Sequence, residues 1–439
     1  PELARRYLIV GLGAAGLAAA ETIRHLDADG DILLVSDDPH GYYSRPGLAY
    51  YLTGELAESW LMPFSEADLR RLNLRRLQAR AAGLHPAAQE VELEDGRRLA
   101  YDRLLLATGS QAVPPPMPGA GLQGVVKLDD LADARDILRR CRPARAAVVV
   151  GGGITALELA EGLNARKVHT HYLLRHDRYW PGVLDEVESR IVEERLRKEG
   201  IEIHHGTEVS EIVGQGGRVR GVITAGGERI ACDLVAVAVG VRPRLELAAG
   251  LAVDRGILVD EYLQASLPGI LAAGDVAQVF DPTSGRAALD TLWSIAVGQG
   301  RAAGRNMAGR QAAYRKPVPF NVTRLAGLTT TIIGAVGRGR DASLAGIVRG
   351  ESETWRHHPG VPSAQDNFEV NRVRVLVGQQ ALLGAVVMGD QALSRPLQEL
   401  VADRVDISPI RDDLLRPGAR PAEIILRFWS EGSWWHETP

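Results

Sequence analysis

The sequence predicts an α/β fold with two parallel sheets, followed by a smaller α+β part. Three observations predict it. A glycine-rich turn, GLGAAG over residues 11–16, follows the apolar run 7–10. A second turn, GGGITA over residues 151–156, follows the apolar run 146–150. Beyond Phe320 the pattern changes to short strands, such as 329–334, 373–377 and 382–387.

Each turn has the strand–turn–helix context of a Rossmann-like dinucleotide site. The first glycine of such a turn makes it tight, the second lets the backbone approach a pyrophosphate, and the third position keeps helix and strand close. The positive end of the helix dipole then faces the anion. Two turns in this context predict two dinucleotide sites, and two dinucleotides in one chain indicate electron transfer between them.

Small and acidic residues follow the predicted strands where ligands bind. The strand 31–35 ends at Ser36 and Asp37, and an acid about 20 residues past the glycines is placed to bind ribose hydroxyls. The strand 104–106 ends at Ala107-Thr108-Gly109, and the strand 270–273 ends at Gly274-Asp275. Because these are the carboxyl ends of parallel strands, Asp275 is expected on the ligand side of the sheet.

Composition breaks predict the domain limits. The proline-rich segment 113–119 marks a crossover out of the first sheet, and 240–243 marks the return to it. We expect a first dinucleotide-binding domain over 1–112 and 241–318, a second over 113–240, a C-terminal domain over 319–400, and a tail over 401–439 that is polar and then rich in Trp.

Charge and hydropathy exclude several classes of protein. The 439 residues carry a net charge of −4 and 45% apolar residues, values typical of a soluble globular protein without a nucleic-acid partner. Arg5-Arg6 before the apolar stretch 7–20 has the outline of an export signal, but the glycine spacing and the amphipathic continuation 21–26 favour a folded βα unit. No run reaches the roughly 18 apolar residues of a membrane span, and we expect a cytoplasmic protein.

Neither thiols nor imidazoles form a reactive pattern in the sequence. Cys141 and Cys232 stand far apart in no redox spacing, and we interpret both as packing thiols. The pairs His204-His205 and His357-His358 are adjacent, so their side chains project apart on a strand. No metal site is predicted.

Four motifs in order, GLGAAG, LLLATG, VVVGGGITALELA and GILAAGD, resemble the FAD-dependent pyridine nucleotide-disulfide oxidoreductase superfamily. The resemblance implies an FAD domain, an inserted NAD(P) domain and a C-terminal interface domain through which such chains often form homodimers. It implies that Gly11, Gly13 and Gly16 hold the FAD pyrophosphate, Asp37 the adenosine ribose and Asp275 the ribityl chain. The full set it implies for FAD is Gly11, Gly13, Ala15, Gly16, Ser36, Asp37, Arg45, Pro46, Ala82, Ala107, Thr108, Gly109, Gly274, Asp275 and Trp293.

The segment 40–48, HGYYSRPGL, is similar to the rubredoxin reductase, ferredoxin reductase and nitrite reductase branch of that superfamily. In this resemblance Arg45 lies along FAD and Pro46 near the flavin ring. The redox cysteine of single-cysteine relatives falls on about Gly47. The disulfide chemistry is therefore expected to be absent, with electrons passing from flavin directly to an acceptor.

Three residues are candidates for a catalytic role. Glu158 matches a family glutamate near the flavin, and its usual lysine partner falls on Tyr50. Glu158 is therefore either a proton-handling group or a helix residue satisfied by water or Tyr50. Trp293 opens a W-x-x-A-x-x-Q-G helix whose N-terminus would stabilise reduced flavin, or it is a core aromatic residue.

The second nucleotide site is expected to prefer NADPH to NADH. The strand end that carries an acid in NAD-selective sites falls on Leu174, and the basic run that follows resembles that of glutathione reductase, which also has alanine where Ala156 stands. Alternatively the basic residues form a solvated surface loop. The residues assigned to this site are Gly151, Gly153, Ile154, Thr155, Arg175, His176, Arg178 and Gly240.

The sequence thus predicts an FAD-dependent NAD(P)H oxidoreductase that works without a protein thiol. Its acceptor could be a small redox protein such as rubredoxin or ferredoxin, a quinone or oxygen, and the sequence does not select one. The alternative is a flavin-binding docking or regulatory subunit that oxidises NAD(P)H slowly.

Overall fold

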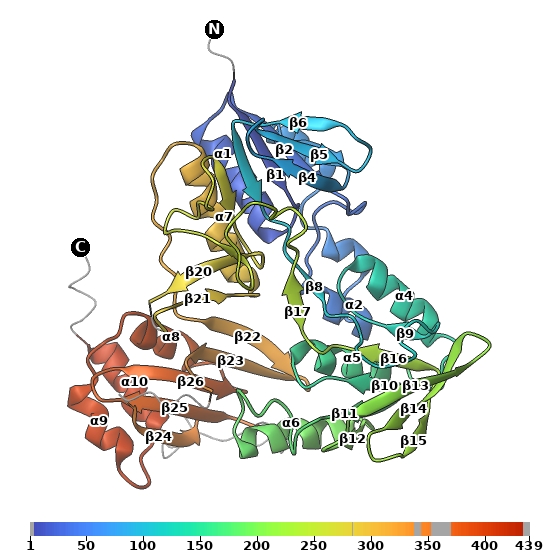
Figure 1. Ribbon diagram of the computed structural model, residues 1–439. Helices are drawn as coiled ribbons and strands as arrows, with labels where there is room; N and C mark the ends of the chain where they lie inside the picture. The colour runs from blue at the N-terminus through green and yellow to red at the C-terminus, as the bar shows by residue number, and fades with distance from the viewer. Residues whose placement is uncertain (1–3, 283, 338–343, 353–369, 433–439) are drawn as a thin grey trace. The chain divides into compact units, whose positions relative to one another are not determined.

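The computed structural model describes residues 4–282, 284–337, 344–352 and 370–432 (Figure 1). The chain forms two compact units. One comprises Pro1–Gly151, Glu158–Tyr172 and Glu208–Lys316, and the other comprises Gly152–Leu157, Leu173–Thr207 and Pro317–Pro439. His357, His358, Trp434 and Trp435 lie outside the described residues.

The first predicted sheet is five-stranded and parallel, in the order β19-β7-β1-β2-β3. Its central strands are almost continuously apolar, as is typical of a parallel sheet covered on both faces. The core includes Leu8, Ile9, Leu104 and Leu105, all at most 2% exposed. The strands are β1 (Arg6–Val10), β2 (Asp31–Ser36), β3 (Arg75–Gln78), β7 (Arg103–Leu106) and β19 (Ile270–Ala272).

Helices α1 (Ala14–Leu26) and α7 (Trp293–Met307) pack against each other beside this sheet (Figure 1). Small residues allow the close approach. A Cβ added at Gly304 would lie 2.7 Å from the carbonyl oxygen of Ala19, and one added at Gly300 would collide with the carbonyl of Ala15. The glycines of α7 therefore fix how its N-terminus sits next to the first glycine turn.

The second predicted sheet has the order β12-β11-β10-β16-β9. Its central pairs β10–β16 and β16–β9 are parallel. The strands are β9 (Val125–Val126), β10 (Ala146–Val150), β11 (His169–Leu173), β12 (Glu202–His204) and β16 (Leu234–Val237), and the associated helices are α4 (Leu131–Cys141), α5 (Ile154–Ala165) and α6 (Glu186–Lys198).

The two crossover segments pair with each other. β8 (Ser110–Ala112), directly before the proline-rich segment 113–119, and β17 (Val241–Pro243), within 240–243, are antiparallel neighbours. The smaller elements are β4 (Ala81–His85), β5 (Glu90–Leu93), β6 (Arg98–Ala100), β13 (Val209–Gln215), β14 (Arg218–Thr224), β15 (Arg229–Ala231), β18 (Ile257–Leu258), β20 (Ala277–Asp281), β21 (Arg286–Leu289), α2 (Leu48–Thr53), η1 (Glu58–Leu61) and α3 (Glu66–Arg71).

The C-terminal part is a five-stranded antiparallel sheet with helices packed on it, in the order β22-β23-β26-β25-β24. This confirms the predicted fold class. The segment from residue 401 onward, expected from the sequence only as a tail, contributes helices whose Leu414 and Ile425 are buried in the same core. The elements are β22 (Phe320–Leu325), β23 (Leu328–Gly334), β24 (Leu344–Glu351), β25 (Arg372–Gly378), β26 (Leu382–Met388), α8 (Ser394–Ala402), α9 (Ser408–Leu415) and α10 (Pro421–Glu431).

Candidate functional site

The first glycine turn combines two obligatory glycines with one that faces open space. Gly11 has φ +114°, and a Cβ there would collide with the backbone of Ala107, as one at Gly16 would with Gly11. At Gly13, by contrast, an added Cβ would have no heavy atom of the described chain within 4 Å. Gly13 is also the N-cap of α1 and supplies no side-chain cap. The turn therefore offers backbone N–H groups and room for an anion.

The predicted strand-end residues lie where the sequence places them. Asp37 is exposed directly after β2, and the Ser36 hydroxyl accepts a hydrogen bond from the Asp38 N–H at 3.2 Å. After β7, Gly109 takes a left-handed φ of +69°, and the Thr108 hydroxyl donates to the Arg244 carbonyl at 3.0 Å. Ala82 is exposed on β4.

Asp275 is partly buried and has a hydroxyl donor. The Ser110 hydroxyl donates to its carboxylate at 2.6 Å. Burial raises the pKa of Asp275, while the Ser110 hydrogen bond and the charges of Arg45 and Arg244 act in the opposite direction. The preceding residue, Gly274, donates its N–H to the side chain of Gln299 at 2.7 Å, which ties this strand end to α7. A Cβ added at Gly274 would lie 3.1 Å from the Cβ of Ala15, so this strand end adjoins the first glycine turn.

Arg45 is tied to the loop before α4. Its guanidinium donates to the carbonyl of Asp129 at 2.7 Å and lies 5.7 Å from the ring centre of Tyr43. Arg244 binds the Asp129 carboxylate at 3.1 Å. The exposed Pro46 follows in the same turn. Sequence reasoning missed Ser110, Asp129 and Arg244; of these, only Ser110 carries a local signal, since it directly follows the strand-end turn 107–109.

Trp293 is the first residue of α7 and is 50% exposed. This exposure excludes the interpretation as a core aromatic residue. The N-cap of α7, Leu292, makes no side-chain cap. The first N–H groups of α7 therefore have no side-chain cap from Leu292, and their role toward the flavin stays a prediction of the W-x-x-A-x-x-Q-G resemblance.

Glu158 has a pKa close to neutrality. Burial is the main cause and the charge of Glu161 adds to it, together raising the pKa of Glu158 to about 7. Tyr50 lies on α2, which approaches α5 closely, since a Cβ at Gly162 would be 2.9 Å from the Cβ of Leu52. A carboxyl group that titrates near pH 7 favours the proton-handling interpretation of Glu158.

Both cysteines are free and buried. Burial raises the pKa of Cys141 to about 11 and that of Cys232 to about 12. Because the thiolate is the reactive form, these thiols are inert at neutral pH. The prediction of two packing thiols is confirmed, and Gly47 stands as the N-cap of α2.

The second glycine turn has the same open character as the first. Gly151 takes φ +146°, and Cβ atoms added at Gly152 or Gly153 would meet nothing within 4 Å in the described chain. Ile154 and Thr155 then open α5. Gly240, after β16, takes φ +127° and accepts the Val113 N–H at 2.9 Å.

The loop after β11 is basic at its tip. Leu174 is buried and donates its N–H to the His204 carbonyl at 2.9 Å, which confirms that the strand end carries no acid. Arg175 and His176 are exposed. The Nε atom of Arg178 is buried and has no hydrogen-bond partner within the described part of the chain. The Arg178 guanidinium also pairs with the Asp177 carboxylate at 3.4 Å, so Arg175 and His176 are the exposed basic side chains of this loop.

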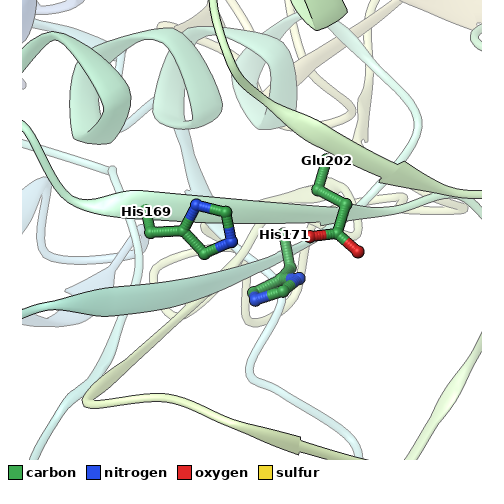
Figure 2. Close-up of side chains that lie close together, drawn as sticks. All are labelled: His169, His171 and Glu202. Carbon is green, nitrogen blue, oxygen red and sulfur yellow. The ribbon is translucent and has the colours of Figure 1, made fainter.

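The histidine pair His169 and His171 was not identified in the sequence analysis. His169 and His171 are two residues apart on β11, so they project from the same face of the strand, and their rings meet edge to face with centroids 4.7 Å apart. Figure 2 shows them with Glu202 of β12, the neighbouring strand in the sheet order. The prediction of no metal site considered only adjacent histidines, and we assign no ion to this pair.

Comparisons with known proteins agree with this arrangement. Residues 5–300 match the family model for pyridine nucleotide-disulphide oxidoreductase. An NADH oxidase of Methanocaldococcus jannaschii is 30% identical over 420 residues, which are 92% of this chain and 90% of the relative. The biphenyl dioxygenase system ferredoxin–NAD(+) reductase component of Paraburkholderia xenovorans is 33% identical over 79% of this chain and 84% of the relative.

Comparison with solved structures gives a similar fold over nearly the whole chain. The reductase of a covalent putidaredoxin reductase–putidaredoxin complex superposes with a TM-score of 0.83 at 25% identity, over 97% of this chain and 99% of the other. No helix in the described ranges is both long and apolar enough to cross a membrane. The chain is an oxidoreductase that belongs to the pyridine nucleotide-disulphide oxidoreductase family, whose members bind FAD and use NAD(P)H, and it lies close to the ferredoxin and rubredoxin reductase branch.

Proposed function

We propose that this enzyme binds FAD at the first glycine turn, oxidises NADPH in preference to NADH, and passes the electrons to an iron–sulfur redox protein of the ferredoxin or rubredoxin class. The observation that carries the proposal is the pair of open glycine turns, each beside a predicted nucleotide-binding strand end. When bound, FAD supplies the step between a two-electron hydride donor and an acceptor that takes single electrons.

The residues of the first site fit FAD. The uncapped start of α1 and the open space at Gly13 suit a pyrophosphate, and Asp37 suits the ribose hydroxyls. Asp275, with Ser110 as its donor, presents a carboxylate that can accept hydroxyl hydrogen bonds from the ribityl chain. The uncapped start of α7 would stabilise negative charge on the reduced ring, and Glu158 would hold or release a proton near neutral pH.

The acceptor is proposed from relatives and from the thiols of this chain. The reductase component of Paraburkholderia xenovorans is named for ferredoxin, and the rubredoxin–NAD(+) reductases of Pseudomonas putida and Ectopseudomonas oleovorans for rubredoxin. Both cysteines of this chain are free and buried, so they form no disulfide that could accept electrons from the flavin. Direct transfer from flavin to the acceptor is the remaining route, and the relatives named for ferredoxin and rubredoxin favour a one-electron acceptor.

The preference for NADPH is proposed from the loop after β11. Arg175 and His176 are exposed, and the Arg178 guanidinium has an unused buried donor. A charge-assisted contact to a 2′-phosphate is worth roughly 1.5 to 3 kcal/mol. Several relatives are named for NAD or NADH, so both nucleotides belong in the test.

The Arg175→Glu variant tests this preference. It replaces an attractive contact by a repulsive one, so the ratio of kcat/KM for NADPH over that for NADH should fall at least about tenfold. Arg190→Glu, which reverses a charge on the exposed side of α6, is the matched control and should leave the ratio unchanged. An Arg175→Glu variant with the ratio of the parent would show that the loop does not recognise the 2′-phosphate.

A further inference from the structure

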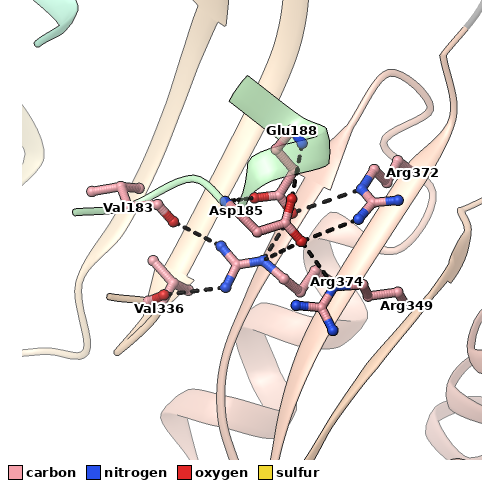
Figure 3. Close-up of polar contacts among 7 residues, drawn as sticks. All are labelled: Val183, Asp185, Glu188, Val336, Arg349, Arg372 and Arg374. Carbon is pink, nitrogen blue, oxygen red and sulfur yellow. Dashed lines mark hydrogen bonds and ion pairs between the residues drawn. The ribbon is translucent and has the colours of Figure 1, made fainter. Parts of the chain in front are cut away.

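A buried arginine of the C-terminal sheet is hydrogen-bonded to the loop 174–185, which carries Arg175 and Arg178. Arg374 on β25 is 4% exposed. Its guanidinium donates to the Glu188 carboxylate at 2.8 Å, to the Val183 carbonyl at 2.7 Å and to the Val336 carbonyl at 3.2 Å. Figure 3 shows the guanidinium between these three groups. One side chain thus joins the loop, the start of α6 and the segment just after β23.

The start of α6 is itself closed by a capping box. The Asp185 carboxylate accepts the Glu188 N–H, and the Glu188 carboxylate accepts the Asp185 N–H, both at 2.8 Å. Arg349 and Arg372 bind the other oxygen of Asp185 at 2.8 and 3.1 Å (Figure 3). Glu188 is fully buried. Through it, Arg374 determines where the N-terminus of α6 lies.

The middle of the loop is fixed by the same helix. The Tyr179 N–H donates to the buried Glu193 carboxylate at 2.8 Å, and the Ser189 hydroxyl donates to the Tyr179 carbonyl at 2.6 Å. At the other end Leu174 is hydrogen-bonded into the sheet. The tip 175–178, in which 175–177 are exposed and Arg178 is partly buried, runs between these two anchors. The His176 carbonyl in it accepts the Gly206 N–H at 3.0 Å, and the anchor at Tyr179 is held by α6.

The backbone is also pressed together at the Val336 end. A Cβ on Gly337 would lie 2.8 Å from the carbonyl oxygen of Gly182, so the chain after β23 touches the loop backbone directly. Trp180 holds a left-handed φ of +47°, which costs free energy for a residue with a side chain. A strained, tightly contacted turn of this kind persists only while its surroundings hold it.

A gain in folding stability alone does not explain why the charges of Arg374 and Glu188 are buried. Replacing a buried ion pair by apolar side chains of similar volume is often neutral or stabilising, because desolvation offsets the attraction. An arginine fork that binds two main-chain carbonyls and a carboxylate instead fixes geometry. The contact set of Arg374 is of the latter kind.

We propose that Arg374 is a positioning residue for nucleotide recognition: from the C-terminal sheet it fixes the loop 174–185 and so aims Arg175 and Arg178 at the adenosine phosphate. The proposal rests on the proposed nucleotide site. Arg374 itself does not contact the nucleotide.

The test compares Arg374→Met with Arg349→Met in the FAD-loaded full chain. Both variants remove one positive charge from the same cluster, but of the two only Arg374 binds the loop backbone: among the described residues Arg349 binds the Asp185 carboxylate, and its side chain is 45% exposed. Binding of NADP+ is measured by calorimetry, and hydrogen exchange reports the amides of 174–185. FAD content and melting temperature verify the fold.

Arg374→Met should weaken NADP+ binding about tenfold and speed exchange in 174–185, while Arg349→Met stays within about twofold of the parent in both. Should Arg374→Met fail to fold, Arg374→Lys replaces it, because an ammonium keeps the charge but cannot span both carbonyls. A folded Arg374 variant with the parent's affinity and exchange overturns the proposal.

The outcome is separable from that of the proposed function. If the parent binds neither NADP+ nor NAD+, the proposed nucleotide site is wrong, whereas exchange in 174–185 still measures whether Arg374 fixes the loop. If the parent binds NADP+ and the Arg374 variants bind it equally well, the site stands and the positioning role falls.

Discussion

Asp275 illustrates how local chemistry prepares one carboxylate for a ligand. Burial opposes its ionisation, and a hydroxyl donor with two nearby guanidinium groups favours it. A polar ligand rich in hydroxyl groups would add hydrogen bonds to the same carboxylate. Asp275 is thus better suited to binding a hydroxyl-rich ligand than to stabilising the fold, since burying part of a charge costs free energy that only hydrogen-bond partners offset.

Replacing Asp275 by Ala should therefore lower flavin occupancy rather than unfold the protein. Loss of a hydrogen bond to a charged group costs roughly 1.5 to 3 kcal/mol, or about 10- to 100-fold in FAD affinity. The measurement is the ratio of flavin to protein absorbance after purification and dialysis. Asp95→Ala, in an exposed turn, is the control. Full occupancy in Asp275→Ala would remove Asp275 from the site.

Glu158 predicts a dependence of stability on pH. Its pKa is raised from 4.5 to about 7 in the folded chain, so the folded state loses stability as the pH rises from 4.5 through 7. Glu158→Gln should remove this loss and raise the free energy of unfolding above pH 7, on the order of 3 kcal/mol, with little change below pH 4.5.

Denaturant unfolding of the two proteins at several pH values checks this prediction for Glu158. Glu228→Gln, at an exposed turn, is the control variant and should follow the parent. If Glu158→Gln has the same profile as the parent, the carboxyl group is not held in a low-dielectric environment, and its proton-handling role loses its support.

Among the secondary-structure elements, the two glycine turns show which parts of the fold a local sequence pattern can predict. Their spacing correctly predicts strand, turn and helix, because tight turns and close packing allow few residues at Gly11 and Gly16. The contacts of Arg45 with Asp129 and of Ser110 with Asp275 join residues far apart in the sequence. No local period encodes such contacts, so only the folded chain reveals them.

The C-terminal helices show what a local sequence pattern does not predict. The strands β23, β25 and β26 alternate clearly enough to be predicted, whereas α9 and α10 were predicted only as part of a tail. Each is short and is stabilised by burying residues such as Leu414 and Ile425 in a core that the sheet provides. Helices this short depend on tertiary packing, which the sequence pattern does not display.

The start of α1 gives a prediction that separates binding from folding. Gly13→Val should leave the fold intact, because an added Cβ meets nothing within 4 Å in the described residues, and should weaken FAD binding at least about tenfold by occupying the pyrophosphate space. Gly121→Val, another open glycine without a positive φ, controls for the change in backbone freedom. Circular dichroism and FAD titration of both apoproteins decide it; equal FAD affinity in the two would contradict the assignment.

At the scale of the whole molecule, the chain keeps the architecture of a disulfide reductase family without its thiol chemistry. Its cysteines are buried with raised pKa values, and the position of the redox cysteine in single-cysteine relatives falls on about Gly47. Changing Cys141 and Cys232 together to Ala should leave NAD(P)H oxidation within about threefold of the parent, a barrier change under about 1 kcal/mol. A folded, flavin-loaded double variant without turnover would place a thiol in the electron path.

An anaerobic titration of the purified enzyme with NADPH shows whether electrons pass through FAD without a protein thiol. If FAD is the only redox group of the chain, flavin absorbance should be bleached completely by one equivalent of NADPH per FAD, in the parent and in the cysteine double variant alike, and restored by an oxidised ferredoxin or rubredoxin. A second equivalent consumed by the parent but not by the double variant, or a flavin that neither NADPH nor NADH reduces, would contradict the account.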